Sequence, residues 1–275
     1  MSDPVRLQVY LARRGLGSRR HCEQFIREGR VTVNGQRATL GCSVTESDKV
    51  LLDGESLPRS EALVHLAVHK PMGYLCANQD PRGRPLVADL LADVGARLYH
   101  VGRLDLQSSG LIFYTNDGHF ARTVMHPSSQ VEKDYLVETR EPIAPEQLTA
   151  FQRGIVLGGE RYRLQRFEQR SQRRVLLTLV EGKNREIRLV FEHFGLRLRS
   201  IHRVRIGCVR LKGIPTGAYR TLSATEVRWF TERAAGAAGQ AARATGQTPD
   251  AKPLRGARGG ARGARGPRPG RDAGR

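Results

Sequence analysis

Apolar and polar residues alternate in a helix-then-strand pattern at the start of the chain, over residues 5–53. The spacing predicts two short helices, the second capped by Ser18 and ended by Gly29. Alternating valines then lead into Asn34-Gly35, a dipeptide typical of a tight β-hairpin. We therefore expect a small α/β module at the N-terminus.

Residues 63–232 mix strand-like and helix-like patterns without a regular alternation. Apolar runs typical of strands occupy residues 63–69, 111–115, 135–139, 175–180 and 201–206. Helical stretches are expected at residues 120–125 and 185–194. This order predicts an α+β domain with a mainly antiparallel mixed sheet, joined to the N-terminal module by a linker at residues 54–62.

Residues 233–275 form a low-complexity segment of Ala, Gly, Pro and Arg. The segment holds ten basic and two acidic residues and no aromatic residue. Such a composition cannot bury enough apolar surface to offset the entropy lost on ordering, so we expect a disordered basic tail. A phosphate-contacting role and a dispensable extension are both compatible with it.

Charge narrows the class of partner. Lys plus Arg number 46 against 27 for Asp plus Glu, a net charge of +19. Nucleic acid is the expected partner, because each neutralised phosphate releases a counterion. A merely soluble basic protein is the alternative, and a membrane surface is disfavoured because no basic stretch has an apolar face. Without an apolar run long enough to span a bilayer, or a secretory signal, we expect a cytoplasmic protein, by default a monomer.

The four cysteines are widely spaced, and no two form a CxxC pair. They are Cys22, Cys42, Cys76 and Cys208. Disulfides are rare in a reducing cytosol, and the histidines do not cluster with the cysteines at metal-ligand spacing. We expect four free thiols and no metal site.

Three polar segments carry the candidate chemistry. The first reads GRLDLQSSGL (residues 102–111) and is followed by TNDG (115–118). The others read KDYLV (133–137) and EGKNREIR (181–188). Taken alone, Asp105 in the first segment is more typical of a turn or cap residue than of a catalyst. The three segments in this order change that interpretation.

Together these segments resemble the pseudouridine synthases of the branch that modifies ribosomal RNA, with its GRLDxxSSGL, KxYxV and EGxNRxxR motifs. The run ARRGLGSRRHCEQFIREGRVTVNG (12–35) resembles the S4 RNA-binding domain. In that family two helices and a basic turn lie against structured RNA, which here assigns RNA binding to Arg13, Arg14, Arg19 and Arg20. The third motif likewise assigns RNA binding to Lys183, Asn184 and Arg185. The resemblance covers about residues 5–230.

The resemblance implies a reaction without a cofactor, in which the N1–C1′ bond of uridine breaks, the uracil turns, and C5 joins C1′. Asp105 would be the required carboxylate, acting either by covalent attack or in a glycal-type elimination. Arg188 is expected to hold Asp105 charged, and Tyr135 to lie over the uracil and handle the C5 proton. Lys133 would support the pocket or a phosphate, and Arg103 would fill the space left by the flipped uridine.

Other functions remain as alternatives. A non-catalytic ribosomal RNA-binding or assembly factor would explain the charge, but not the joint presence of the three motifs. A glycoside hydrolase would need a second acid, and a tRNA synthetase would need a nucleotide-binding signature; neither is visible. Residues 75–85 and the basic tail favour 23S over 16S ribosomal RNA as the target, whether naked or within an assembling subunit. Phe113 and Tyr114, where the family often has aliphatic residues, are expected to be core variation.

Overall fold

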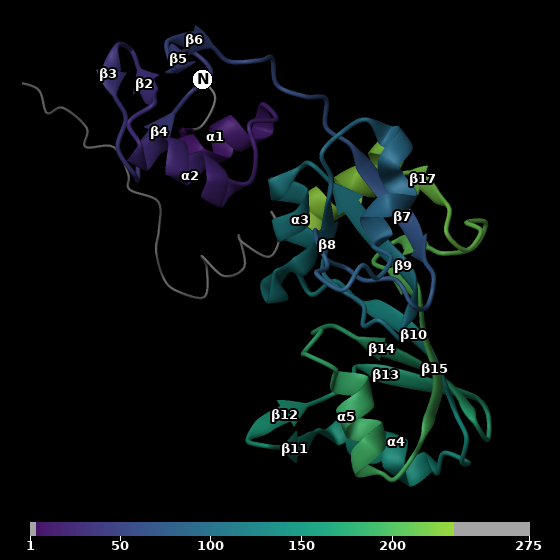
Figure 1. Ribbon diagram of the computed structural model, residues 1–275. Coiled ribbons are helices and arrows are strands. Elements are labelled where there is room, and N and C mark those ends of the chain that lie inside the picture. The colour runs from purple at the N-terminus through teal and green to yellow at the C-terminus, as the bar shows by residue number, and fades with distance from the viewer. Residues whose placement is uncertain (1–3, 234–275) are drawn as a thin grey trace, which may run out of the picture. The chain divides into compact units, whose positions relative to one another are not determined.

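The computed structural model of the chain describes residues 4–233 (Figure 1). Its N-terminal part contains the helices α1 (Leu7–Arg13) and α2 (Arg19–Arg27). Six short strands accompany them: β1 (Val5–Arg6), β2 (Val31–Val33), β3 (Gln36–Arg37), β4 (Ser43–Val44), β5 (Val50–Leu52) and β6 (Glu55–Ser56). The order β3-β2-β5-β6 forms an antiparallel sheet, and β1 pairs with β4. A small core of its own, which includes Leu11, Ile26 and Val31, joins the helices to the strands.

The local signals read from this part of the sequence are confirmed. The Ser18 hydroxyl accepts a hydrogen bond from the His21 N–H at 3.1 Å, which caps α2 as expected. Asn34 and Gly35 have φ angles of 52° and 82°, the left-handed pair that a two-residue hairpin between β2 and β3 requires. Strand β5 pairs with β2 and extends this hairpin to a third strand.

A nine-stranded sheet forms the larger part of the described chain. Its strands are β7 (His65–Lys70), β8 (Tyr99–Val101), β9 (Ser109–Thr115), β10 (Lys133–Thr139), β13 (Arg166–Ser171), β14 (Arg174–Leu179), β15 (Leu198–Ile206), β16 (Val209–Arg210) and β17 (Tyr219–Thr221). The order is β13-β14-β10-β15-β9-β7-β17, with β8 beside β9 and β16 beside β15. Among these described strands every pairing is antiparallel except that of β9 with β15. The predicted α+β fold with a mainly antiparallel sheet is confirmed.

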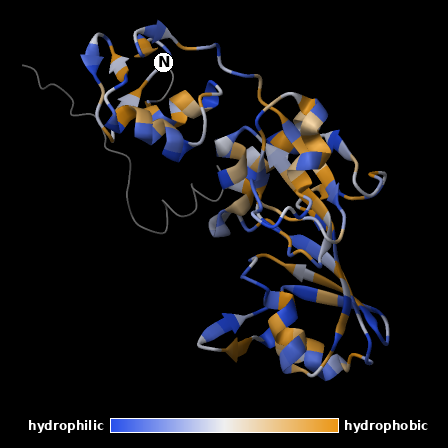
Figure 2. Cartoon of the chain, viewed as in Figure 1, coloured by the Kyte–Doolittle hydropathy of each residue, from blue (hydrophilic) through white to orange (hydrophobic). Residues whose placement is uncertain are grey.

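Helices and a second small sheet complete this part. They are η1 (Val87–Val94), α3 (Gly118–Met125), η2 (Pro127–Ser129), α4 (Pro145–Arg153), α5 (Glu186–His193), a helix at residues 224–233, and the pair β11 (Ile155–Leu157) and β12 (Glu160–Tyr162). Strand β11 is hydrophobic along its length, while β12 is mostly hydrophilic (Figure 2).

Two hydrophobic clusters lie in this larger part, and β9 contributes to both. Ile112 and Tyr114 belong to the cluster that also contains residues of α4 and α5, whereas Phe113 packs with Phe120 and Phe230 in the other. This alternation follows from the two-residue period of a strand that is buried on both faces. Phe113 and Tyr114 are 0% and 2% exposed, so their assignment to the core is confirmed.

Composition also led to expectations about the cysteines, membrane-spanning segments and the C-terminal tail. The four cysteines are free thiols, as expected. In the part of the chain described here, no helix is long and apolar enough to cross a membrane. Residues 234–275, which make up the predicted basic tail apart from its first residue, lie outside the described part of the chain. The domain boundaries inferred from the sequence stay predictions.

Candidate active site

A polar loop between β8 and β9 carries Asp105, and a buried lysine holds this loop in place. The Lys70 ammonium donates to the carbonyl oxygens of Ser108 at 2.6 Å, Pro71 at 3.0 Å and Leu106 at 3.4 Å. Lys70 is 0% exposed, and burial lowers its pKa to about 8. Sequence reasoning missed Lys70, because a single lysine at the end of an apolar strand normally points to solvent.

Asp105 forms an ion pair with Arg188, which lies in α5 and 83 residues further along the chain. The Arg188 Nε donates to Asp105 Oδ2 at 2.9 Å. Its Nη2 donates to the Ser108 hydroxyl at 3.0 Å, so one guanidinium contacts both the carboxylate and the loop that carries it. The Asp105 side chain remains 35% exposed. The carboxylate is therefore held in one orientation and still accessible from the cavity.

The Asp105 side chain lines a cavity of about 790 Å³, which is large enough for a nucleoside. The three polar segments singled out in the sequence meet in its wall. Every site residue predicted in the larger part lines it, namely Arg103, Asp105, Lys133, Tyr135, Lys183, Asn184, Arg185 and Arg188. Leu75 and Cys76, from the segment that favoured a large-subunit target, line it as well.

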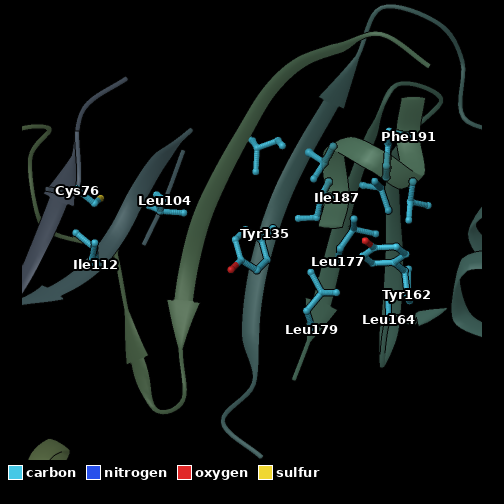
Figure 3. Close-up of a cluster of buried hydrophobic side chains, with 14 of the residues drawn as sticks. Cys76, Leu104, Ile112, Tyr135, Tyr162, Leu164, Leu177, Leu179, Ile187 and Phe191 are labelled. Atoms are coloured by element: carbon cyan, nitrogen blue, oxygen red, sulfur yellow. The ribbon is translucent and has the colours of Figure 1, made fainter. Parts of the chain in front are cut away.

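Tyr135, in strand β10, forms part of the cavity wall. Figure 3 shows its ring between the residues around Leu104 and Ile112 and those around Leu177 and Ile187. Only 8% of the residue is exposed. Its hydroxyl accepts a hydrogen bond from Arg203 Nη1 at 3.3 Å, which orients the ring.

Lys133 begins the same strand and turns its ammonium toward backbone. It donates to the carbonyl oxygens of Val131 at 2.9 Å and Val180 at 3.1 Å. Burial, and after it the neighbouring Arg203, lower its pKa to about 8. Of the two roles expected for Lys133, these contacts favour support of the pocket over contact with a phosphate.

Residues 181–188, the third segment, line the cavity at the start of α5, where the backbone is irregular. Arg185 has φ 53° at the N-cap, and the Lys183 ammonium donates to Glu160 at 3.0 Å and to the Arg161 carbonyl at 2.7 Å. Glu186 is 5% exposed, and burial raises its pKa to about 7. Lys183 is thus tied to β12, while Asn184 and Arg185 are exposed at the cavity wall.

The TNDG segment, by contrast, builds the fold. Asn116 Oδ1 accepts from the Val64 N–H at 2.8 Å, and Asp117 caps α3 by accepting from the N–H groups of His119 and Phe120. The Asp117 carboxylate also lies 3.0 Å from His65 Nε2. These bonds fix the C-terminal end of β9 and the start of α3.

The arginines predicted to bind RNA in the N-terminal part differ in their surroundings. Arg14 lies over the Tyr10 ring at 3.6 Å and pairs with Glu46 at 2.8 Å. Arg13, Arg19 and Arg20 are exposed and have no ion-pair partner within residues 4–233. Three cations therefore face solvent at the turn between α1 and α2.

Metal ligands are not gathered anywhere in the described part of the chain. Residues 4–233 contain no group of three or more His, Cys, Asp or Glu side chains placed to hold a metal ion. The charged groups that line the cavity include the carboxylate of Asp105 and the basic side chains around it.

Comparison with known proteins assigns this arrangement to a family. A model described as RNA pseudouridylate synthase matches residues 64–193, and one described as the S4 domain matches residues 5–50. An uncharacterized RNA pseudouridine synthase of Borreliella burgdorferi is 37% identical over 233 residues, 83% of this chain and 94% of that protein. The chain belongs to the RNA pseudouridine synthase family.

Other relatives of this pseudouridine synthase carry a more specific name. Ribosomal large subunit pseudouridine synthase B of Bacillus subtilis is 36% identical over 230 residues, 81% of this chain and 94% of that protein. The protein of the same name from Escherichia coli is 38% identical over 239 residues, 82% of each chain. A crystal structure titled pseudouridylate synthase matches with a TM-score of 0.61 and 28% identity, and covers 82% of this chain and 99% of that one.

Proposed function

We propose that the enzyme isomerises a specific uridine of large-subunit (23S) ribosomal RNA to pseudouridine, with Asp105 as the reacting carboxylate and without a cofactor. One observation carries the proposal. The Asp105–Arg188 ion pair, with its carboxylate accessible, lies in a cavity of about 790 Å³ whose wall contains Tyr135. Isomerisation of uridine neither oxidises nor hydrolyses, so one oriented carboxylate and a pocket that retains the base meet its needs.

The residues divide the chemistry among them. Arg188 pairs with the Asp105 carboxylate and orients it, so that it can act on the sugar either by forming a bond to C1′ or by removing the C2′ proton. Tyr135 lies against the base and is placed to handle the C5 proton. Arg103, an exposed residue of the loop that carries Asp105 and part of the cavity wall, would stack in the space that the flipped uridine leaves.

The partner is RNA, and several features support a ribosomal one. The two curated relatives named above act on the large subunit according to their names. The S4 domain contributes Arg13, Arg19 and Arg20 as exposed phosphate ligands, and Arg14 through its stacked and paired side chain. Asn184 and Arg185 would contact RNA at the cavity rim. A single copy of the chain would meet this RNA in the bacterial cytoplasm, either free or within an assembling subunit.

Tritium release from C5-labelled transcripts tests the proposal. The wild-type protein is expected to release tritium from a 23S transcript, and Asp105→Asn to release at least about 10³-fold less because the amide cannot act as a carboxylate. Glu146→Gln, the same type of change at an exposed position outside the cavity, should match the wild type.

Two outcomes would redirect the assignment. Release from 16S and none from 23S would move the target to the small subunit. Tight RNA binding without release from either transcript, or from an assembly particle, would instead support a non-catalytic assembly factor.

A further inference from the structure

Three cations in or beside the cavity wall form no ion pair with a carboxylate in the described part of the chain. Lys70 is 0% exposed and Arg203 is 4% exposed, and Lys133 is partly buried. Within residues 4–233 none of the three has an acidic partner, because Lys70 and Lys133 donate only to backbone carbonyls, and Asp105 is already paired with Arg188. The cavity wall carries a positive electrostatic potential, because its basic side chains outnumber its acidic ones: Arg103, Lys133, Lys183, Arg185, Arg188 and Arg203 against Asp105, Glu181 and Glu186.

Arg203 is the most unusual of these groups. Its Nε donates to the Leu111 carbonyl at 2.6 Å and its Nη1 to the Tyr135 hydroxyl at 3.3 Å. Its Nη2 is buried without any hydrogen-bond partner in the described part of the chain. Burying a charge without a counter-ion lowers stability, so its retention here calls for a function.

The backbone is arranged to bring Arg203 to the cavity. A bulge in β15 pairs Arg203 with Tyr135 but Arg205 with Asp134, so that the two arginines serve opposite faces of the sheet. Strand β9 approaches Arg203 closely through Gly110, where an added Cβ would lie 2.3 Å from the Arg203 carbonyl oxygen. Only glycine allows this approach.

The reaction has one stage that needs a positive potential. When the C1′–N1 bond breaks, its electron pair stays on N1, and the detached uracil is an anion with its charge spread over N1, O2 and O4. The sugar is neutralised either by a bond from Asp105 to C1′ or by transfer of its C2′ proton to Asp105. The pair that then joins C5 to C1′ comes from the uracil anion, while the Asp105–C1′ bond breaks or, in the elimination route, the proton on Asp105 returns to C2′. C5 then loses its proton, N1 gains one, and the Asp105 carboxylate is restored.

We propose that Arg203, backed by Lys70 and Lys133, is a positioning residue that orients the Tyr135 hydroxyl and stabilises the negative charge on the detached uracil. The inference rests on the proposed function. Preorganised charge of this kind lowers the barrier because it favours the charged stage over the neutral substrate. It predicts an effect on the chemical step and little effect on RNA affinity.

Single-turnover kinetics at saturating RNA test this prediction. Arg203→Gln should slow the rate by about 10²-fold, with a dissociation constant within about twofold of wild type. Arg203→Lys, which keeps the charge, should recover at least about tenfold of that loss. Arg205→Gln, on the same strand but directed to the other face, is the matched control and should stay within about threefold.

A change of leaving group separates an electrostatic role from a structural one. A 23S transcript made with 5-fluorouridine releases a more stable anion, since fluorine withdraws electrons. The Arg203→Gln defect, followed as appearance of the rearranged fluorinated nucleoside, should then be at least about fivefold smaller than with uridine. Equal defects for both transcripts would overturn the inference and leave Arg203 as a packing residue.

A second variant and the behaviour of the wild-type protein cover the remaining outcomes. If Arg203→Gln does not fold, Lys133→Met removes a second of the three charges and should show the same smaller defect with 5-fluorouridine; equal defects there would overturn the inference too. Failure of the proposed function looks different, because the wild-type protein itself would then convert neither transcript.

Discussion

The guanidinium of Arg188 does more for Asp105 than neutralise it. Because Nε contacts the carboxylate and Nη2 contacts Ser108, the planar fork fixes both the side chain and its loop. Lysine cannot make both bonds, so Arg188→Lys is expected to lower the single-turnover rate of tritium release by about 10- to 100-fold. Ser108→Ala removes one neutral acceptor and should cost no more than about tenfold. Equal losses in the two variants would contradict a role for the fork.

Glu186 gives the protein a measurable dependence on pH. Burial raises its pKa from 4.5 to about 7. Between these values the folded state keeps a proton that the unfolded state has lost, so the free energy of unfolding falls as pH rises and levels off above about 7. The shift corresponds to up to about 3 kcal/mol. Urea unfolding at pH 5 and pH 8 should show this loss in the wild type and in Glu146→Gln, and a smaller one in Glu186→Gln.

At the scale of elements, the parallel pairing of β9 with β15 depends on Gly110. Its φ is 109°, and a Cβ there would meet the Arg203 backbone at 2.3 to 2.9 Å. Gly110→Ala is therefore expected to lower the free energy of unfolding by about 3 kcal/mol or more, measured by urea denaturation. Gly95→Ala, with φ 67° and open space around it, tests the conformation alone and should cost only about 1 kcal/mol. A similar loss in both variants would show that contact with β15 is unimportant.

Elements with a strong apolar period were predictable, and those without one were not. Strands β7, β9, β10, β14 and β15 were expected within a few residues of their ends, because each buries alternate or successive apolar side chains. Strand β13 was missed because all but one of its residues are exposed. Helix α4 was missed as well, because it buries only Leu148 and Phe151.

The site shows the same division. Motif resemblance selected Asp105, Tyr135 and Arg188, which the structure brings into one cavity. Lys70 and Arg203 were not predicted. A charged residue in an apolar strand is normally assigned to the solvent side when the neighbouring strands are unknown. The contact from Arg203 to Leu111 spans 92 residues, and no local pattern encodes it.

At the scale of the whole molecule, basic charge outside the cavity should govern how tightly RNA is held rather than how fast it reacts. Residues 234–275 contain nine basic and two acidic residues, and this charge acts on phosphates without sequence preference. A chain ending at Arg233 is therefore expected to bind 23S transcripts more weakly. When the logarithm of the association constant for the transcript is plotted against the logarithm of the salt concentration, the slope should be smaller in magnitude by about two to six.

A tail of equal length with glutamine in place of its basic residues is the control and should behave like the truncation. Both variants should keep the wild-type single-turnover rate at saturating RNA within about twofold. An unchanged slope would make the segment a dispensable extension, and a reduced saturating rate would mean that it contributes to the chemistry.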